Sequence, residues 1–116
     1  TTATTADIIE GTANDDTITG TQASYQGGDI INGGAGDDTL TLTLNAAQAG
    51  NATVFNVETI NVQATSFTTL TYNATGVVGV GTTVNVSNHQ VGGATGFTVS
   101  NAGLGMTITA GAGVTG

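Results

Sequence analysis

The chain has 116 residues with no Lys, Arg or Cys, and its formal net charge is −8 at pH 7. The lack of cationic side chains argues against nucleic acid as a partner and against direct insertion into or binding to an anionic membrane, and the lack of Cys excludes disulfides and thiol chemistry. Only 38% of residues are hydrophobic and 4% aromatic. We therefore expect residues 1–116 to form a single domain with a thin core, in which metal and backbone hydrogen bonds stabilise more than usual.

No apolar run is long enough to span a membrane, and no signal peptide opens the chain. Both ends fall in repeat-like sequence, so we expect the chain to be a piece of a longer protein.

The acidic residues are concentrated near the start of the chain. Seven of the eight carboxylates are Asp7, Glu10, Asp15, Asp16, Asp29, Asp37 and Asp38. Clustered carboxylates repel one another, and the chain has no Lys or Arg to offset them. A fold that gathers them needs either a bound metal or full solvation.

An internal repeat organises these acids. Residues 7–19 (DIIEGTANDDTIT) match residues 29–41 (DIINGGAGDDTLT) at nine of thirteen positions. The repeat divides into units of nine residues, and in each unit an Asp is followed two positions later by a large aliphatic residue. These aliphatic residues are Ile9, Ile18, Ile31 and Leu40.

Residues 33–41 (GGAGDDTLT) fit every position of the nonapeptide G-G-x-G-x-D-x-U-x, in which U is a large aliphatic. Residues 24–32 and 11–19 fit it in part, and residues 2–10 fit it weakly. On this motif the chain resembles the RTX (repeats-in-toxin) family of secreted calcium-binding proteins. A further segment, residues 56–62 (NVETINV), is similar to an element that follows such repeats in bacterial S-layer proteins.

The chemistry of the motif suits Ca²⁺. Glycine permits positive φ, so the backbone can turn its carbonyl groups inward, while the Asp supplies a charged oxygen. Calcium takes six to eight oxygen ligands, more than one such loop offers, so two loops must share each ion. A solvated acidic loop is the alternative interpretation.

The resemblance implies a β-roll in which each nonapeptide stacks on the next but one. Asp16 and Asp38 would then face each other across one calcium ion, with Asp7 and Asp29 forming a second, weaker site. The carbonyl ligands of the first site would lie near Thr12, Asn14, Gly34 and Gly36. Asp15 and Asp37 are expected to point outward. For Glu58 we expect a solvated strand residue, with metal ligation as the less favoured alternative.

Strand signals continue along the rest of the chain. Alternation of apolar residues with Thr or Asn extends the row of Ile18 and Leu40 through three later pairs, which are Ile60 and Val62, Val84 and Val86, and Met106 and Ile108. A second row comprises Ile9, Ile31, Val54, Val77 and then Phe97 or Val99. Leu70 and Tyr72 fit neither row and predict a third face or an inserted hairpin.

Together these rows predict an all-β fold, a right-handed parallel β-solenoid of about five coils of roughly 22 residues. Calcium loops are expected in residues 2–41 and metal-poor coils in residues 42–116.

Outward positions of the first row form two files of small polar side chains, mostly Thr. Such ladders resemble the ice-binding face of β-solenoid antifreeze proteins, although Thr is also a favoured residue on any exposed strand. His89 is the only histidine and lies in a polar loop. With no catalytic motif in the chain, we do not expect an enzyme.

The leading functional hypothesis is a structural module of a secreted bacterial surface-layer protein. The resemblance implies type I secretion, folding on extracellular Ca²⁺, localisation at the cell surface and self-association in a lattice. A cell-surface polysaccharide is a further candidate partner. Alternatives are a solenoid module of a type I secreted adhesin or biofilm protein, a calcium-dependent ice-binding solenoid, and the non-catalytic β-roll of a secreted hydrolase or toxin.

Overall fold

The computed structural model describes residues 6–45, 52–65, 70–78, 81–88, 97–103 and 105–110. Within these ranges the regular structure is entirely β, with no helix, and therefore none that could cross a membrane. The strands are β1 (Ile8–Glu10), β2 (Thr17–Thr21), β3 (Ile30–Asn32), β4 (Thr39–Leu44), β5 (Thr53–Phe55), β6 (Thr59–Ala64), β7 (Leu70–Asn73), β8 (Val77–Val78), β9 (Thr83–Asn88), β10 (Phe97–Ser100) and β11 (Thr107–Ala110).

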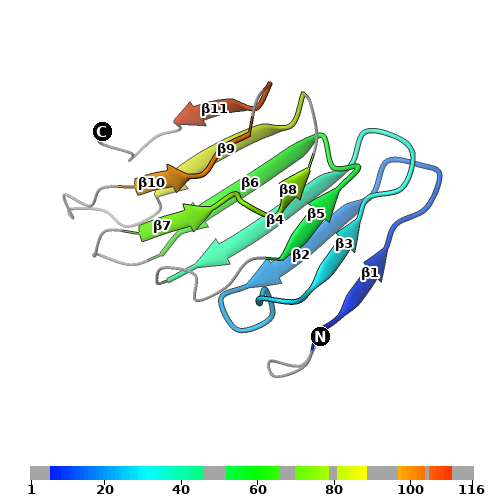
Figure 1. Ribbon diagram of the computed structural model, residues 1–116, viewed down its shortest axis with the longest axis horizontal. Coiled ribbons are helices and arrows are strands. Elements are labelled where there is room, and N and C mark those ends of the chain that lie inside the picture. The colour runs from blue at the N-terminus through cyan, green and yellow to red at the C-terminus, as the bar shows by residue number, and fades with distance from the viewer. Residues whose placement is uncertain are drawn as a thin grey trace.

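These strands form three parallel sheets. The large sheet has the order β11-β9-β6-β4-β2, the small sheet has the order β1-β3-β5-β8, and β10 pairs with β7. Because consecutive strands alternate between sheets and pair only with strands of other coils, the chain winds as a β-solenoid of about three turns (Figure 1). The predicted all-β parallel solenoid is confirmed.

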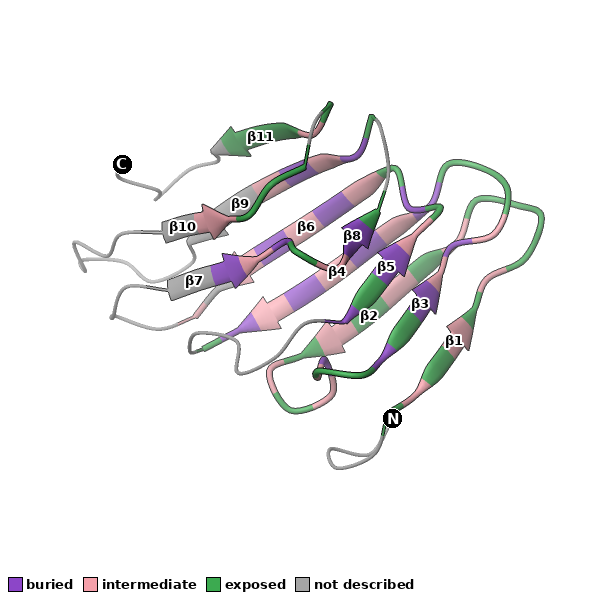
Figure 2. Ribbon diagram, in the orientation of Figure 1, coloured by how far each residue is buried: buried purple, intermediate pink, exposed green. Residues whose placement is uncertain are grey.

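The core lies between the sheets and follows from the alternation in the sequence. In β4 the residues Leu40, Leu42 and Leu44 are almost fully buried, while the Thr residues between them are half-exposed. Figure 2 shows this alternation as bands along β4 and β6. Complete burial of one such side chain contributes roughly 1.5–3 kcal/mol to folding.

The first predicted row is confirmed through four rungs and corrected at the fifth. Ile18, Leu40, Ile60 and Val84 follow one another in register. Opposite Val84 the structure places Ile108, whereas the sequence spacing had placed Met106 there. The last step is longer because Thr107 pairs with Thr83, which leaves Met106 in the turn before the strand.

The second row is confirmed from Ile9 through Ile31 and Val54 to Val77. Its predicted continuation to Phe97 or Val99 is wrong, because both residues belong to β10 and pair with β7. The strand β7, to which Leu70 and Tyr72 belong, therefore lies in a third sheet, which agrees with the expected third face and not with an inserted hairpin.

Tyr72 anchors this third sheet to the core. Its side chain is fully buried, and its hydroxyl lies 3.2 Å from that of Tyr25. Burial, together with the neighbouring Tyr25, raises the pKa of the Tyr72 phenol. A buried Tyr hydroxyl generally requires such a polar partner.

Candidate metal centre

The parallel register gathers the acidic residues at two corners of the solenoid. We call the turn before the small sheet the Asp29 corner. The residues that stack there lie one position before β1, β3 and β5 and are Asp7, Asp29 and Ala52. We call the turn before the large sheet the Asp38 corner. The residues that stack there lie one position before β2, β4, β6 and β9 and are Asp16, Asp38, Glu58 and Thr82. Each predicted pair of aspartates thus occupies adjacent coils.

At the Asp29 corner the buried carboxylate has donors for both of its oxygens. Asp29 is only 2% exposed. Its Oδ1 accepts a hydrogen bond from the backbone N–H of Asp7 at 3.0 Å, and its Oδ2 accepts one from the backbone N–H of Gln26 at 2.8 Å. Backbone donors therefore compensate much of the desolvation of this charge.

At the Asp38 corner the buried carboxylate is only half satisfied. Asp38 is 1% exposed, and its Oδ1 accepts from the backbone N–H of Asp16 at 2.8 Å. Its Oδ2 is the one buried side-chain polar atom of the described residues that has no hydrogen-bond partner. Leaving a buried charged oxygen without a donor or a cation costs several kcal/mol.

Asp16, one coil earlier, is half-exposed and has more partners. Its Oδ2 accepts hydrogen bonds from both the backbone N–H and the Oγ1 of Thr12. The two aspartates of the predicted calcium pair are thus brought together, but in different environments.

Glu58 continues the same stack one coil later. Its Oε2 accepts a hydrogen bond from the backbone N–H of Asp38 at 2.8 Å, just as Asp38 Oδ1 accepts one from the backbone N–H of Asp16. The side chain is exposed, as expected, but Glu58 lies in the turn before β6 and not in a strand. It belongs to the acidic column, the stack of Asp16, Asp38 and Glu58. A shared signal could have revealed this, because an acid followed by Thr and an aliphatic residue recurs at residues 16–18, 38–40 and 58–60.

The glycine turns explain why these coils can stack so closely. Gly34 and Gly36 have φ of 108° and 124°, a region that other residues rarely adopt. A Cβ on Gly34 would lie 2.0 Å from the carbonyl oxygen of Thr12, and one on Gly36 would lie 2.8 Å from the backbone of Asn14. The predicted carbonyl ligands therefore lie in two directly stacked turns, where the Thr12 carbonyl already accepts a hydrogen bond from the N–H of Ala35.

The remaining acids do not converge on the corners. Asp15 and Asp37 are exposed, and Asp15 accepts from the N–H of Asp37. Glu10 accepts from the side-chain amide of Asn32. Nowhere in the described ranges do three or more His, Asp or Glu side chains gather in a metal-binding group. A cation at either corner would need backbone carbonyls and water as further ligands. His89 lies outside the described residues.

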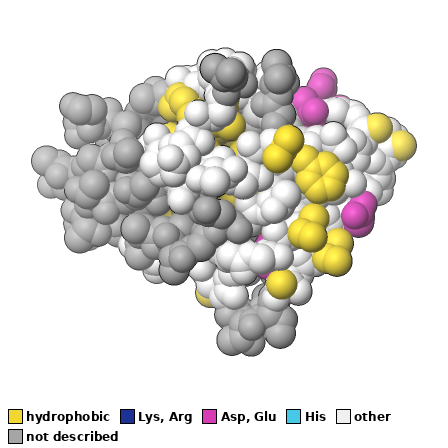
Figure 3. Space-filling model, viewed as in Figure 1, with side chains coloured by type: hydrophobic (Ala, Val, Ile, Leu, Met, Phe, Trp, Pro, Cys, Tyr) yellow, Lys and Arg dark blue, Asp and Glu magenta, His cyan; other side chains and the backbone are white. Residues whose placement is uncertain are grey.

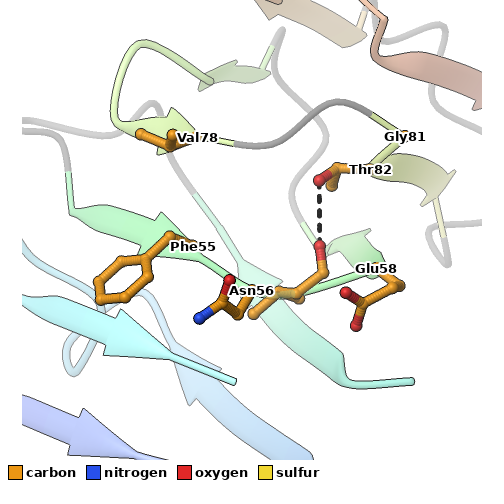
Figure 4. Close-up of a pocket in the computed structure, with 7 residues that line it drawn as sticks. Phe55, Asn56, Glu58, Val78, Gly81 and Thr82 are labelled. Carbon is orange, nitrogen blue, oxygen red and sulfur yellow. Dashed lines mark hydrogen bonds between the residues drawn. The ribbon is translucent and has the colours of Figure 1, made fainter. Parts of the chain in front are cut away.

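An open hollow of about 600 Å³ adjoins the Asp38 corner (Figure 4). Its lining residues are Phe55, Asn56, Val57, Glu58, Val78, Gly81 and Thr82. The Thr82 hydroxyl donates to the Val57 carbonyl at 3.0 Å, so the fourth rung of the column is occupied by a neutral, satisfied group.

The two broad faces of the solenoid differ in character. The outward face of the large sheet carries the file Thr17, Thr39, Thr59, Thr83 and Thr107 and beside it the file Thr19, Thr41, Asn61, Asn85 and Thr109. Neither file contains a charged residue. The small sheet instead exposes Ile8, Ile30 and Val78, and hydrophobic side chains gather on this face in Figure 3.

No family model, curated protein or solved structure matches the chain.

Proposed function

We propose that the chain is a calcium-binding structural module of a secreted, surface-associated bacterial protein. The observation that carries this proposal is the Asp38 carboxylate, which is buried with one oxygen unpartnered in a chain that has no Lys or Arg. Carboxylate and backbone carbonyl oxygens are the ligands that Ca²⁺ prefers. We further propose that residues 2–41 supply calcium loops, in a solenoid whose five coils correspond to the five stacked strands of the large sheet.

In this proposal the protein's own residues hold the coils in register, and a bound Ca²⁺ supplies the positive charge that the sequence lacks. Asp16 and Asp38 would present their carboxylates from adjacent coils, and the turns at residues 11–15 and 33–37 would contribute carbonyl groups. Because residues from successive coils share the ion, binding favours the folded chain over the unfolded one. Folding on reaching extracellular calcium, followed by association with identical neighbours, would suit a surface layer.

The test compares the purified chain in EDTA and in millimolar CaCl₂ by far-UV circular dichroism and thermal melting. We expect less β structure and a lower melting temperature in EDTA than in calcium, because the bound ion stabilises only the folded chain. A ligand at a hundred times its Kd contributes about 2.7 kcal/mol to folding stability. Millimolar MgCl₂ is the control, because Mg²⁺ demands a more rigid octahedral site. Identical spectra and melting midpoints in EDTA and CaCl₂ would refute the proposal.

A second candidate function rests on the charge-free face of the large sheet. Its Thr and Asn files are regularly spaced on strands about 4.8 Å apart, which is the geometry of an ordered polar lattice. Ice binding is the function that this face would serve. Thermal hysteresis at millimolar protein tests it, and its absence would remove this candidate without affecting the calcium proposal.

A further inference from the structure

We propose that the principal cation site lies between the second and third coils and is formed by Asp38, the Asn56 carbonyl and Glu58. This inference rests on the proposed calcium function and relocates its strongest site, which the sequence had assigned to Asp16 and Asp38. Two of the three ligands, Asn56 and Glu58, lie outside the nonapeptide repeats.

The first step concerns the donors available to each aspartate. Asp16 Oδ2 is already bonded to Thr12, which offers both a backbone N–H and a hydroxyl. The residue equivalent to Thr12 in the next coil is Gly34, which has no hydroxyl. Its N–H donates instead to Asn32 Oδ1 at 3.2 Å. Asp38 Oδ2 is therefore left without a donor, because the repeat changes from Thr to Gly at this position.

The second step concerns where this oxygen lies. A Cβ placed on Gly33 would be 2.5 Å from Asp38 Oδ2 and 1.8 Å from the carbonyl oxygen of Asn56. The two oxygens therefore lie within about 4.3 Å of each other, a separation that one calcium ion bound at 2.3–2.6 Å from each can bridge. Asn56 belongs to the third coil, since the residue before it, Phe55, pairs with Asn32.

The third step adds a second carboxylate and room for water. Glu58 Oε2 accepts from the N–H of Asp38, so the carboxylate group is held against the residue that carries the orphan oxygen. Among the described residues Glu58 Oε1 has no hydrogen-bond partner. Asn56 and Glu58 both line the hollow beside this corner. Water in that hollow would complete the six to eight oxygens that Ca²⁺ requires.

The calcium affinity of two single variants separates this site from the one between the first two coils. Glu58→Gln keeps an acceptor for the Asp38 N–H but removes the charge, whereas Asp16→Asn makes the matched change one coil earlier. By isothermal titration with CaCl₂ we expect Glu58→Gln to weaken the tightest binding by roughly tenfold or more. Asp16→Asn should change it by less than about threefold. The reverse pattern would overturn the inference.

Amide chemical shifts of the wild-type chain give a measurement that does not depend on a variant folding. During a CaCl₂ titration we expect the largest shifts at Asp38 and at residues 56–58. Largest shifts at residues 12–16, with residues 56–58 unmoved, would contradict the inference while leaving the calcium function intact. No binding by the wild-type chain would instead refute the proposed function itself.

Discussion

Asp29 and Asp38 lie nine residues apart in the same repeat, at two corners of the solenoid, and both are almost fully buried. Backbone N–H groups of Asp7 and Gln26 satisfy both oxygens of Asp29, whereas Asp38 receives a single bond from Asp16 and keeps one oxygen unpartnered. Burial of a carboxylate therefore does not by itself indicate a metal site. A buried carboxylate whose two oxygens both accept hydrogen bonds, such as Asp29, needs no cation. A buried carboxylate with an unpartnered oxygen, such as Asp38, is a candidate metal ligand.

The largest expected effect tests how tightly each corner is packed. At the Asp38 corner, Gly33→Ala would place a Cβ 1.8 Å from the backbone oxygen of Asn56, so two coils must separate. At the Asp29 corner, the Cβ of Gly28→Ala would meet, among the described residues, only the Ala6 Cβ at 3.2 Å, and the φ there is 98°. We expect losses in the free energy of unfolding of more than about 3 kcal/mol and about 1 kcal/mol, respectively.

Urea denaturation in CaCl₂ measures both losses. Gly103→Ala is the control, because no described residue lies within 4 Å of its Cβ position, and it should leave the stability unchanged. Equal losses for Gly33→Ala and Gly28→Ala would show that the coils at the Asp38 corner do not require a glycine in order to pack closely.

The next effect compares the two aspartates directly, in EDTA. In Asp29→Asn the amide NH₂ must face one of two backbone donors, so about 1–3 kcal/mol of stability should be lost. In Asp38→Asn the amide oxygen can still accept from Asp16, and the NH₂ replaces the unpartnered charged oxygen. This variant should be at least as stable as the wild type in EDTA.

The two variants should also differ in their calcium response. Thermal melting in EDTA and in CaCl₂ should show the calcium-dependent rise in melting temperature largely lost in Asp38→Asn and largely retained in Asp29→Asn. A retained response in Asp38→Asn would remove the distinction drawn between the corners.

The smallest effect concerns the rung of the Asp38 corner that carries no acid. Thr82→Val keeps the side-chain volume but deletes the hydroxyl that donates to the Val57 carbonyl. We expect a loss of about 1 kcal/mol, equal with and without calcium, because this rung has no charge to neutralise. Urea denaturation in both buffers measures it, and a calcium-dependent loss would extend the cation site to this coil.

Much of the fold was predictable because it depends on the alternation of apolar and polar residues along each strand. The rows through Leu40 and through Ile31 were identified from period-two patterning and the spacing of the repeat, and the register confirms them. The fifth rung and the place of Val99 were not predicted correctly. Beyond the repeat the step between paired residues varies from 20 to 27 residues, and spacing alone does not show which strands pair.

For the candidate site, the residues involved were predictable but their hydrogen bonds were not. The sequence identified Asp16, Asp38 and the glycine turns, and it also showed that no Lys or Arg can neutralise the acids. The shared pattern of an acid, Thr and an aliphatic residue also pointed to Glu58. Only the register and the hydrogen bond from the Asp38 N–H to Glu58 show that Glu58 continues the column.

By itself, then, the sequence determined the solenoid, its alternating core and the set of acidic residues, since each follows from residue type and short-range period. Only the tertiary structure decided which carboxylate oxygen is left without a donor. That outcome depends on which backbone N–H groups the neighbouring coils bring within reach, and a glycine in place of Thr12 one coil later is enough to change it.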